Sequence, residues 1–297
     1  MQSTSVVIPT CNRASLLADS LKSVFAQTVQ PDEVILIDDG STDNTPDVAA
    51  RYPQVRYVRT ENQGKSAAIN LAMTLMTGTR LWVVDDDDIA CPDALQKLGA
   101  ALDANPSAGF SYGRHDRFTD PANGGERVWQ DTGYWRECHP RDFLIATMED
   151  MFTHQSGMLF QKTLLDATGP FDTGLKRSVD YDYILRAARI STSVACPAIV
   201  FHQRQHDGDR GSGANRFPAS ELVRRWIQHD QIIFKRIYET WALDEFLPRG
   251  ESVVGTPSKR QALIQRGAIM ARKKLWDHAM RDFANAALLM DLDLTQA

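Results

Sequence analysis

The most constraining feature of this chain is the alternation of short apolar runs with amphipathic stretches in the first third of its length. The apolar runs VVI, VILI and LWVV are continuous rather than alternating, a pattern typical of strands that are covered on both faces. Strands that alternate with helices predict βαβ units and a mainly parallel sheet. The expected strands span residues 5–9, 33–38, 55–58 and 81–85, and the expected helices span 14–27, 45–51, 65–76 and 92–104.

Composition excludes several other classes of protein. The 297 residues include 33 Lys+Arg and 38 Asp+Glu, a net charge of −5, whereas a dedicated nucleic-acid binder is usually basic. No apolar run approaches the ~18 residues of a membrane span, and the start MQSTSVVIPT lacks the pattern of a signal peptide. Cys11, Cys91, Cys138 and Cys196 form no CxxC pair. We therefore expect no zinc or disulfide framework, and a reducing cytoplasm.

The character of the sequence changes near residue 215. We expect an α/β domain at 1–215 and an all-helical C-terminal extension at 216–297, because helical apolar faces replace the strand pattern there. The expected elements of the later sequence are strands at 156–160 and 194–201, a loop at 119–125, a mobile loop at 203–218, helices at 219–241 and 259–291, and a linker at 247–258.

Acidic residues follow two of the expected strands. Asp85–Asp88 comes directly after LWVV, and Asp38-Asp39 closes EVILI. Ligands of open parallel sheets bind beyond the carboxyl ends of the strands, and alternation along a strand points Asp85 and Asp87 the same way. Clustered carboxylates repel one another unless a cation joins them, so the run indicates a hard divalent ion, Mg²⁺ or Mn²⁺. A solvated acidic turn is the competing interpretation.

The order of the motifs resembles the family 2 glycosyltransferases, which are inverting enzymes of the GT-A fold. This resemblance implies an α/β, Rossmann-like mixed sheet, mainly parallel, and a nucleotide-diphospho-sugar donor. The matching segments are SVVIPTCNR (5–13), EVILIDDGSTDNT (33–45), ENQGKSAAIN (61–70), VVDDDDIACPDAL (83–95), GPFDTGL (169–175) and DYDYILRAA (180–188).

The resemblance also implies a role for each matching residue. Asp180 looks like the catalytic base, although Val179 stands where the family often has Glu, so Asp182 is the fallback. Asp87 looks like the metal ligand of the DXD motif, and His206 fits a histidine that some GT-A enzymes place on the metal. The residues implied to bind the nucleotide-sugar are Pro9, Thr10, Cys11, Arg13, Asp39, Asn62, Gly64, Lys65, Asp85 and Asp86.

The chemistry of these residue types agrees with a single displacement that inverts the anomeric carbon. A divalent cation neutralises the departing diphosphate, and a carboxylate accepts the proton of the attacking hydroxyl. The implied partners are a nucleotide-sugar, with UDP as the leading nucleotide, and a glycan, lipid-linked or surface-polysaccharide acceptor. The residues that could contact the acceptor, or simply pack in the core or a lid, are Trp129, Tyr134, Trp135, His154 and Gln155.

Two other functions stay open. A metal-dependent phosphoryl-transfer enzyme would also use an Asp cluster, but its aspartate nucleophile normally follows the first strand, which here ends in Pro9-Thr10. A non-enzymatic protein that binds partners through its helical tail is the other alternative. A nicotinamide dehydrogenase is disfavoured because no GxGxxG follows a strand.

The tail resembles a single tetratricopeptide repeat at 259–291, with an ordinary helical hairpin as the alternative. We expect it to dock on the helix at 219–241 and to form a homodimer or partner surface. Residues 249–281 hold eight basic and two acidic side chains, which suit either an anionic membrane surface, at the inner face of the membrane, or simple solvation. The repeat-like positions are Leu263, Gly267, Ala279, Phe283 and Ala286.

Overall fold

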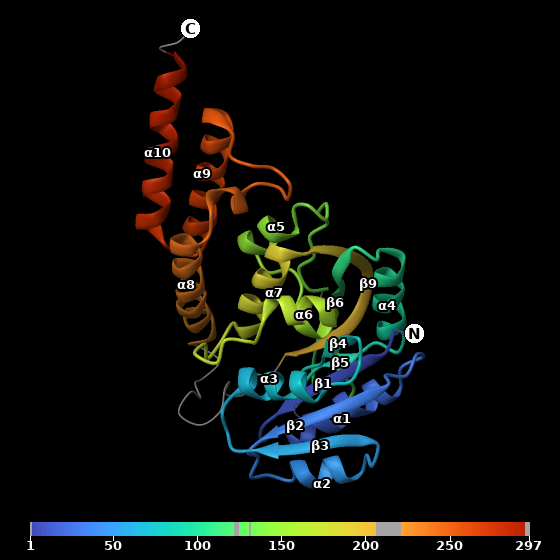
Figure 1. The fold of residues 1–297 in the computed structure, drawn as a ribbon. Helices are drawn as coiled ribbons and strands as arrows, with labels where there is room; N and C mark the ends of the chain where they lie inside the picture. Colours follow the sequence, from blue (N-terminus) through green and yellow to red (C-terminus); the bar gives the residue numbers. More distant parts are fainter. Residues whose placement is uncertain (1, 122–124, 131, 206–220, 295–297) are drawn as a thin grey trace. The chain divides into compact units, whose positions relative to one another are not determined.

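The computed structural model describes residues 2–121, 125–130, 132–205 and 221–294 (Figure 1). The chain divides into two compact units. We call Met1–Arg136 with Phe152–Ala219 the α/β unit, and Glu137–Met151 with Ser220–Ala297 the helical unit. The short segment 137–151 thus belongs with the helical residues that follow much later in the sequence.

A mixed sheet forms the centre of the α/β unit, in the order β3-β2-β1-β4-β8-β6-β9-β5, with β7 paired to β6 (Figure 1). The expected parallel first half is confirmed, since β1 pairs in parallel with both β2 and β4, and β2 with β3. Strand β8 then runs antiparallel to β4 and to β6. The strands are β1 Thr4–Thr10, β2 Glu33–Asp39, β3 Val55–Thr60, β4 Arg80–Val83, β5 Ile89–Ala90, β6 Ala108–Thr119, β7 Val128–Gln130, β8 Met158–Gln161 and β9 Thr192–Gln205.

The continuous apolar runs have the expected consequence for the core. All seven residues of β1 are buried, and Val6 and Ile8 lie in one apolar cluster with Leu17 and Leu21 of α1. A strand with helices on both faces has no polar side to present, which is why its sequence does not alternate. The helices of this unit are α1 Ala14–Phe25, α2 Thr45–Ala50, α3 Lys65–Leu75, α4 Ala94–Ala104, α6 Lys162–Thr168 and α7 Val179–Ile190, with the short 3-10 helix η1 Gln155–Gly157.

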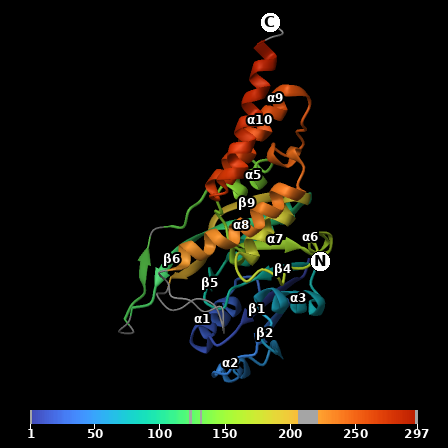
Figure 2. The same cartoon turned by 90° about the vertical axis from the view of Figure 1, so that its left-hand side faces the viewer.

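Strand β6 is the main element that the sequence pattern does not reveal. Its run Arg114, His115, Asp116, Arg117 is polar, yet β6 pairs in parallel with β9 along nearly its whole length. Together β6 and β7 form an arm of the sheet (Figure 2). The expectation of a loop from residue 203 was wrong for 203–205, which continue β9; the rest of that expected loop lies outside the described residues.

The helical unit contains a pair of long helices, α9 and α10, packed on α8 (Figure 1). The expected docking is confirmed: Tyr238 of α8 donates to Asp282 at 3.2 Å, and the Arg266 guanidinium lies 4.3 Å from the Tyr238 ring. A Cβ at Gly267 would lie 2.7 Å from the Phe283 ring, so this crossing requires glycine. The elements are α5 Phe143–Glu149, α8 Leu222–Thr240, η4 Leu243–Phe246, α9 Gly255–Arg272 and α10 Trp276–Leu294.

Between α9 and α10, Arg266 holds the carboxylate of Asp282 with two hydrogen bonds of 2.7 and 2.8 Å. The Asp282 side chain is completely buried. The expected linker at 247–258 is shorter than predicted, because α9 already begins at Gly255. None of the described helices combines the length and the apolar character that a membrane crossing needs.

Candidate functional site

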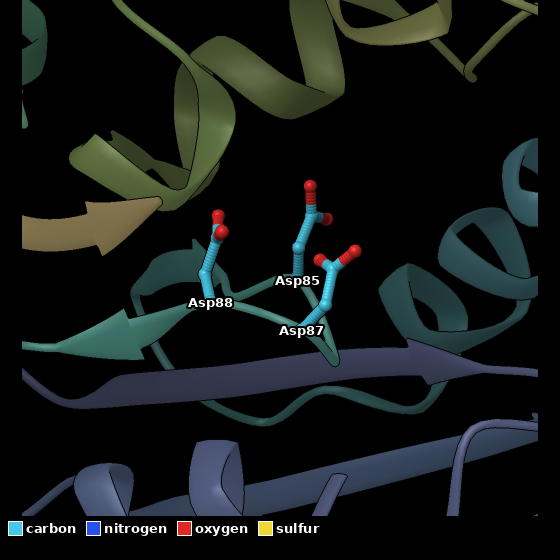
Figure 3. A group of neighbouring side chains, drawn as sticks. All are labelled: Asp85, Asp87 and Asp88. Atoms are coloured by element: carbon cyan, nitrogen blue, oxygen red, sulfur yellow. The ribbon is translucent and has the colours of Figure 1, made fainter. Parts of the chain in front are cut away.

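Three carboxylates converge where the chain leaves β4. Asp85, Asp87 and Asp88 each offer an oxygen, and these oxygens lie within 4.8 Å of one another (Figure 3). The predicted common direction of Asp85 and Asp87 is confirmed. Asp88 joins them because the segment turns, with the Asp88 N–H donating to the Asp85 carbonyl at 3.2 Å. Among the described residues, no other group of three His, Cys, Asp or Glu comes this close.

Two basic side chains contact this acidic segment. Arg13 Nη1 lies 2.9 Å from Asp86 Oδ1 and 2.6 Å from Asp87 Oδ2, and Lys65 Nζ lies 2.6 Å from Asp85 Oδ1. Asp86 chiefly raises the pKa of Arg13. Burial alone would lower the pKa of Lys65, but the carboxylate charge around it raises that pKa above its usual value. Both residues therefore stay positively charged beside the carboxylates.

Two carboxyl groups of the acidic segment, those of Asp86 and Asp88, have raised pKa values. Burial raises the pKa of Asp86 to about 6, against the opposing charge of Arg13. Burial, and then the charges of Asp87 and Asp85, raise the pKa of Asp88 well above its usual range. A cation placed among these oxygens would reverse the shifts, because it favours the ionised form. The donor set of carboxylate oxygens suits a hard divalent ion.

Two neutral donors complete the surroundings of the cluster. Gln155 Nε2 donates to Asp85 Oδ1 at 2.9 Å, and Ser156 Oγ donates to Asp88 Oδ2 at 2.8 Å. Gln155 was expected near the acceptor, and sequence reasoning missed Ser156 and the part of Asp88. The available signal was the position of Gln155 and Ser156 just before the expected strand at 156–160.

The end of β1 lies against the same segment. Pro9 and Thr10 are buried, and Thr10 Oγ1 donates to Asp86 Oδ2 at 2.7 Å. Cys11 is half-buried, with Asn62 Nδ2 3.2 Å from its sulfur. These residues, expected to form the wall for the nucleotide, thus lie together, and Thr10 also fixes Asp86 away from the three converging carboxylates.

Asp39 orders a loop rather than facing solvent. Its two oxygens accept hydrogen bonds from the N–H groups of Gln63 and Gly64, each at 2.8 Å. Asn62 Nδ2 donates to the Asp39 carbonyl at 2.9 Å. Gly40 has φ 78°, and a Cβ there would lie 2.9 Å from the Asn62 nitrogen. Glycine therefore permits both the turn and the close approach of the loop.

Asp180 lies in the first turn of α7, as expected, and borders the same pocket as Gln155. The negative charge of Asp180 helps to raise the pKa of Lys65, so each side chain lies within the electrostatic influence of the other. The fallback, Asp182, is 2% exposed and accepts a 2.9 Å ion pair from Arg186. Asp182 is therefore buried in an ion pair, whereas Asp180 is half-buried and lines the pocket.

The sequence suggested His206 as a histidine ligand of the metal. His206 lies outside the described residues. His202 bonds through Nδ1 to Asp116, and its Nε2 lies 3.4 Å from the Cys91 sulfur. The edge of His202 meets the ring of Trp129, which is 54% exposed. Both nitrogens of His202 are thus engaged apart from the acidic cluster.

The residues expected near the acceptor are partly core. The rings of His154 and His115 meet edge to face at 4.8 Å, and burial lowers the pKa of His154 while Asp180 opposes that shift. Trp135 packs on Tyr112 with ring centroids 5.5 Å apart. Tyr134 is exposed. Of this group, Gln155 lines a pocket together with Asp180, and the charge of Asp180 acts on His154.

Solved structures with low sequence identity share the fold. S. aureus TarS in complex with UDP-GlcNAc has a TM-score of 0.62 at 17% identity, covering 96% of this chain and 89% of that chain. A mannosyltransferase from Pyrobaculum calidifontis in complex with GDP-Man and Mn²⁺ has a TM-score of 0.61 at 20% identity, covering 99% and 79%. The α/β unit therefore has the GT-A fold, with helices appended at its C-terminal side in sequence.

Several curated proteins are similar to this chain in sequence. An uncharacterized glycosyltransferase of Rickettsia typhi is 25% identical over 205 residues, 68% of this chain and 64% of that protein. The chondroitin synthase of Escherichia coli is 27% identical over 206 residues, 68% of this chain and 29% of the synthase. An uncharacterized protein of Sinorhizobium fredii is 33% identical over 191 residues, 61% of this chain and 20% of that protein. The chain thus spans less than two thirds of each of these relatives.

A family match covers more than half of the chain. Residues 5–169 match the family described as Glycosyl transferase family 2. This range includes β1, β2 and the acidic segment after β4, which are the parts that build the site described above. The chain therefore belongs to glycosyl transferase family 2.

Proposed function

We propose that this glycosyltransferase moves a sugar from a nucleotide-diphosphate donor to a hydroxyl acceptor by a metal-assisted single displacement that inverts the anomeric carbon. The observation that carries the proposal is the convergence of Asp85, Asp87 and Asp88 at the edge where β1, β2 and β4 end. Ligands of open α/β sheets bind at this edge. Gln155, which donates to Asp85, lines a pocket together with Asp180, the carboxylate proposed to accept a proton.

Asp85, Asp87 and Asp88 are the residues that would hold the metal ion, Mn²⁺ or Mg²⁺. When bound, the ion would supply positive charge to the departing diphosphate. Arg13 and Lys65 now pair with the same carboxylates. Both side chains are long and cationic, so they can turn toward phosphate oxygens as the donor enters.

Asp180 is proposed to accept the proton of the attacking hydroxyl. Asp180 lies in the first turn of α7, at the positive end of the helix dipole. Lys65 adds positive charge nearby. His154, held neutral by burial, is the proposed acceptor contact beside it, since a neutral imidazole can both donate and accept hydrogen bonds to sugar hydroxyls.

Asp39 and the loop it orders are proposed to hold the nucleobase, with Pro9, Thr10 and Cys11 as the facing wall. The two Asp39 oxygens each bond one backbone N–H, which leaves a second lone pair on each for an imide N–H of a base. UDP is the first candidate nucleotide, because uracil offers such a group. The acceptor is proposed to be a glycan or a lipid-linked sugar.

One experiment on the full chain tests the reaction. Thermal unfolding and hydrolysis would be measured with UDP-, GDP- and dTDP-sugars, each with Mn²⁺, with Mg²⁺ and after exhaustive chelation. One donor should raise the melting temperature by mass action, and only with metal present. Product stereochemistry by NMR should show inversion. Full activity after chelation would contradict the metal role, and retention would contradict the single displacement.

A further inference from the structure

A buried arginine holds the acidic segment from the side of β9. Arg204 Nε donates to the carbonyl oxygen of Asp87 at 2.9 Å, and its backbone N–H donates to Asp88 Oδ1 at 3.4 Å. The Arg204 side chain is only 3% exposed. We propose that Arg204 is a positioning residue of the metal site, which fixes the Asp87–Asp88 peptide so that the three carboxylates converge. This inference rests on the proposed function.

Two carboxylates contact the other two nitrogens of the Arg204 guanidinium. Nη2 lies 2.8 Å from Asp19 of α1, and Nη1 pairs with Asp120, just after β6. The guanidinium also lies 4.9 Å from the centre of the Phe118 ring. Because the guanidinium is planar, the three contacts fix its orientation together. Its Nε–H is therefore held toward the Asp87 carbonyl.

The acidic segment needs such an anchor. Asp85, Asp87 and Asp88 repel one another, because their carboxylate oxygens lie within 4.8 Å of one another. Apart from the short strand β5 that follows, the segment has no regular structure to hold it. The Arg204 side chain restrains the segment through the Asp87 carbonyl and so occupies no carboxylate oxygen of the cluster, although the Arg204 backbone N–H does contact Asp88 Oδ1. Loss of a partner that orients metal ligands typically costs 10–100-fold in metal affinity.

The chain offers a matched control in Arg127. Its Nη2 lies 2.5 Å from Asp19 and its Nε 3.4 Å from Asp120. Its guanidinium lies 5.1 Å from the same Phe118 ring. Arg127 thus shares both carboxylates and the aromatic ring with Arg204. Arg204 differs from Arg127 in its hydrogen bond to the Asp87 carbonyl and in its burial, since the Arg204 side chain is 3% exposed and that of Arg127 is 36% exposed.

The test compares R204Q, R204K and R127Q in the full chain. Mn²⁺ alone would be titrated by calorimetry, and donor turnover would be measured across Mn²⁺ concentrations. We expect R204Q to weaken Mn²⁺ binding roughly 10–100-fold, while kcat at saturating Mn²⁺ recovers most of its value. R204K should fall between R204Q and the natural protein, because lysine keeps the charge but lacks the planar fork. R127Q should change Mn²⁺ affinity less than about twofold.

Each outcome bears on one proposal. Equal Mn²⁺ affinity in R204Q and R127Q, with the natural protein binding Mn²⁺ normally, would overturn the positioning role and leave the metal site standing. No Mn²⁺ binding by the natural protein would instead overturn the metal step of the proposed function, and the role of Arg204 with it. If circular dichroism shows that R204Q does not fold, R204K decides: unchanged Mn²⁺ affinity there would also overturn the inference.

Discussion

Asp38-Asp39 and Asp85–Asp88 both follow buried parallel strands at one edge of the sheet, yet their partners differ in kind. Neutral donors hold the first run: Ser41 N–H and the Tyr57 hydroxyl bond to Asp38 at 2.7 and 2.6 Å, and Asp39 takes two backbone N–H groups. Cations hold much of the second run, as Arg13 and Lys65 do.

The different partners indicate that the first run stabilises the fold and that the second run takes part in the chemistry of the site. Fixed N–H groups of the fold itself hold the first run, so Asp38 and Asp39 shape the turn and the loop beside the sheet. Flexible cationic side chains can move and be replaced by another cation, so the second run can exchange its partners. Two acidic runs that look alike in sequence thus have different roles, and the donor facing each carboxylate is what distinguishes them.

Substitutions at Asp87 and Asp38 should show the largest difference between the two acidic runs. Asp87→Ala should abolish metal-dependent donor binding while the protein stays folded, because it removes a ligand and relieves repulsion. Asp38→Asn should leave metal binding intact and lower the free energy of unfolding by roughly 1–3 kcal/mol, since a buried amide cannot accept from both donors. Calorimetry and denaturant unfolding would measure the two effects. Metal binding lost in Asp38→Asn alone would reverse the two roles.

A carboxylate outside both runs sharpens the contrast. Asp180→Asn is nearly isosteric but cannot take a proton, so it should lower turnover by roughly 10²–10⁴ while donor affinity changes little. Steady-state kinetics with a saturating donor would measure it. Asp182→Asn provides a control, because loss of the ion pair with Arg186 should affect stability more than turnover. Near-normal sugar transfer by the Asp180→Asn variant would show that Asp180 is not the catalytic base.

Asp39 is expected to have both roles: it holds a loop of the fold, as Asp38 holds a turn, and it binds the substrate, as the second acidic run does. Asp39→Ala should weaken nucleotide binding by roughly 1–3 kcal/mol, because the base and the N–H groups of Gln63 and Gly64 lose their acceptor. Asp39→Asn should lose less, since one oxygen remains for the loop. Calorimetry with the free nucleotide measures this without turnover. Unchanged affinity in Asp39→Ala would make Asp39 purely structural, like Asp38.

The smallest expected effect is a pH dependence at Tyr57. Burial and then Asp38 raise the pKa of Tyr57 to about 12, above its usual value near 10. A raised acid pKa in the folded state gives stability that is present below pH 10 and lost as the pH rises toward 12. Asp38→Asn should shift the Tyr57 absorbance titration to lower pH. The same titration midpoint in both proteins would show that Asp38 does not hold this hydroxyl.

Much of the first half of the fold could be predicted, because its strands are apolar on both faces. Strand β6 could not, since residues such as Arg114 and Asp116 lie on a strand whose partners are distant in the sequence. A pattern within one strand cannot show which distant strand will pair with it.

The candidate site follows the same rule. Strand alternation predicted the common direction of Asp85 and Asp87, but β4 ends at Val83 and Asp87 lies in the turn that follows. The convergence of all three carboxylates therefore depends on how the segment turns after β4. Arg204 reaches the Asp87 carbonyl from a strand more than a hundred residues later. The sequence placed that strand's end in a loop, so a long-range contact of this kind had no local signal.

The buried ion pair between Arg266 and Asp282 has a consequence for how the hairpin can change over evolutionary time. Removing either partner leaves the other charge buried and uncompensated, which is far more costly than replacing both by apolar residues. Single substitutions at either position therefore lead through an unfavourable intermediate. Lineages that retain this hairpin should keep the arginine and the aspartate together or lose them together, so that the two positions covary when relatives of the helical unit are aligned.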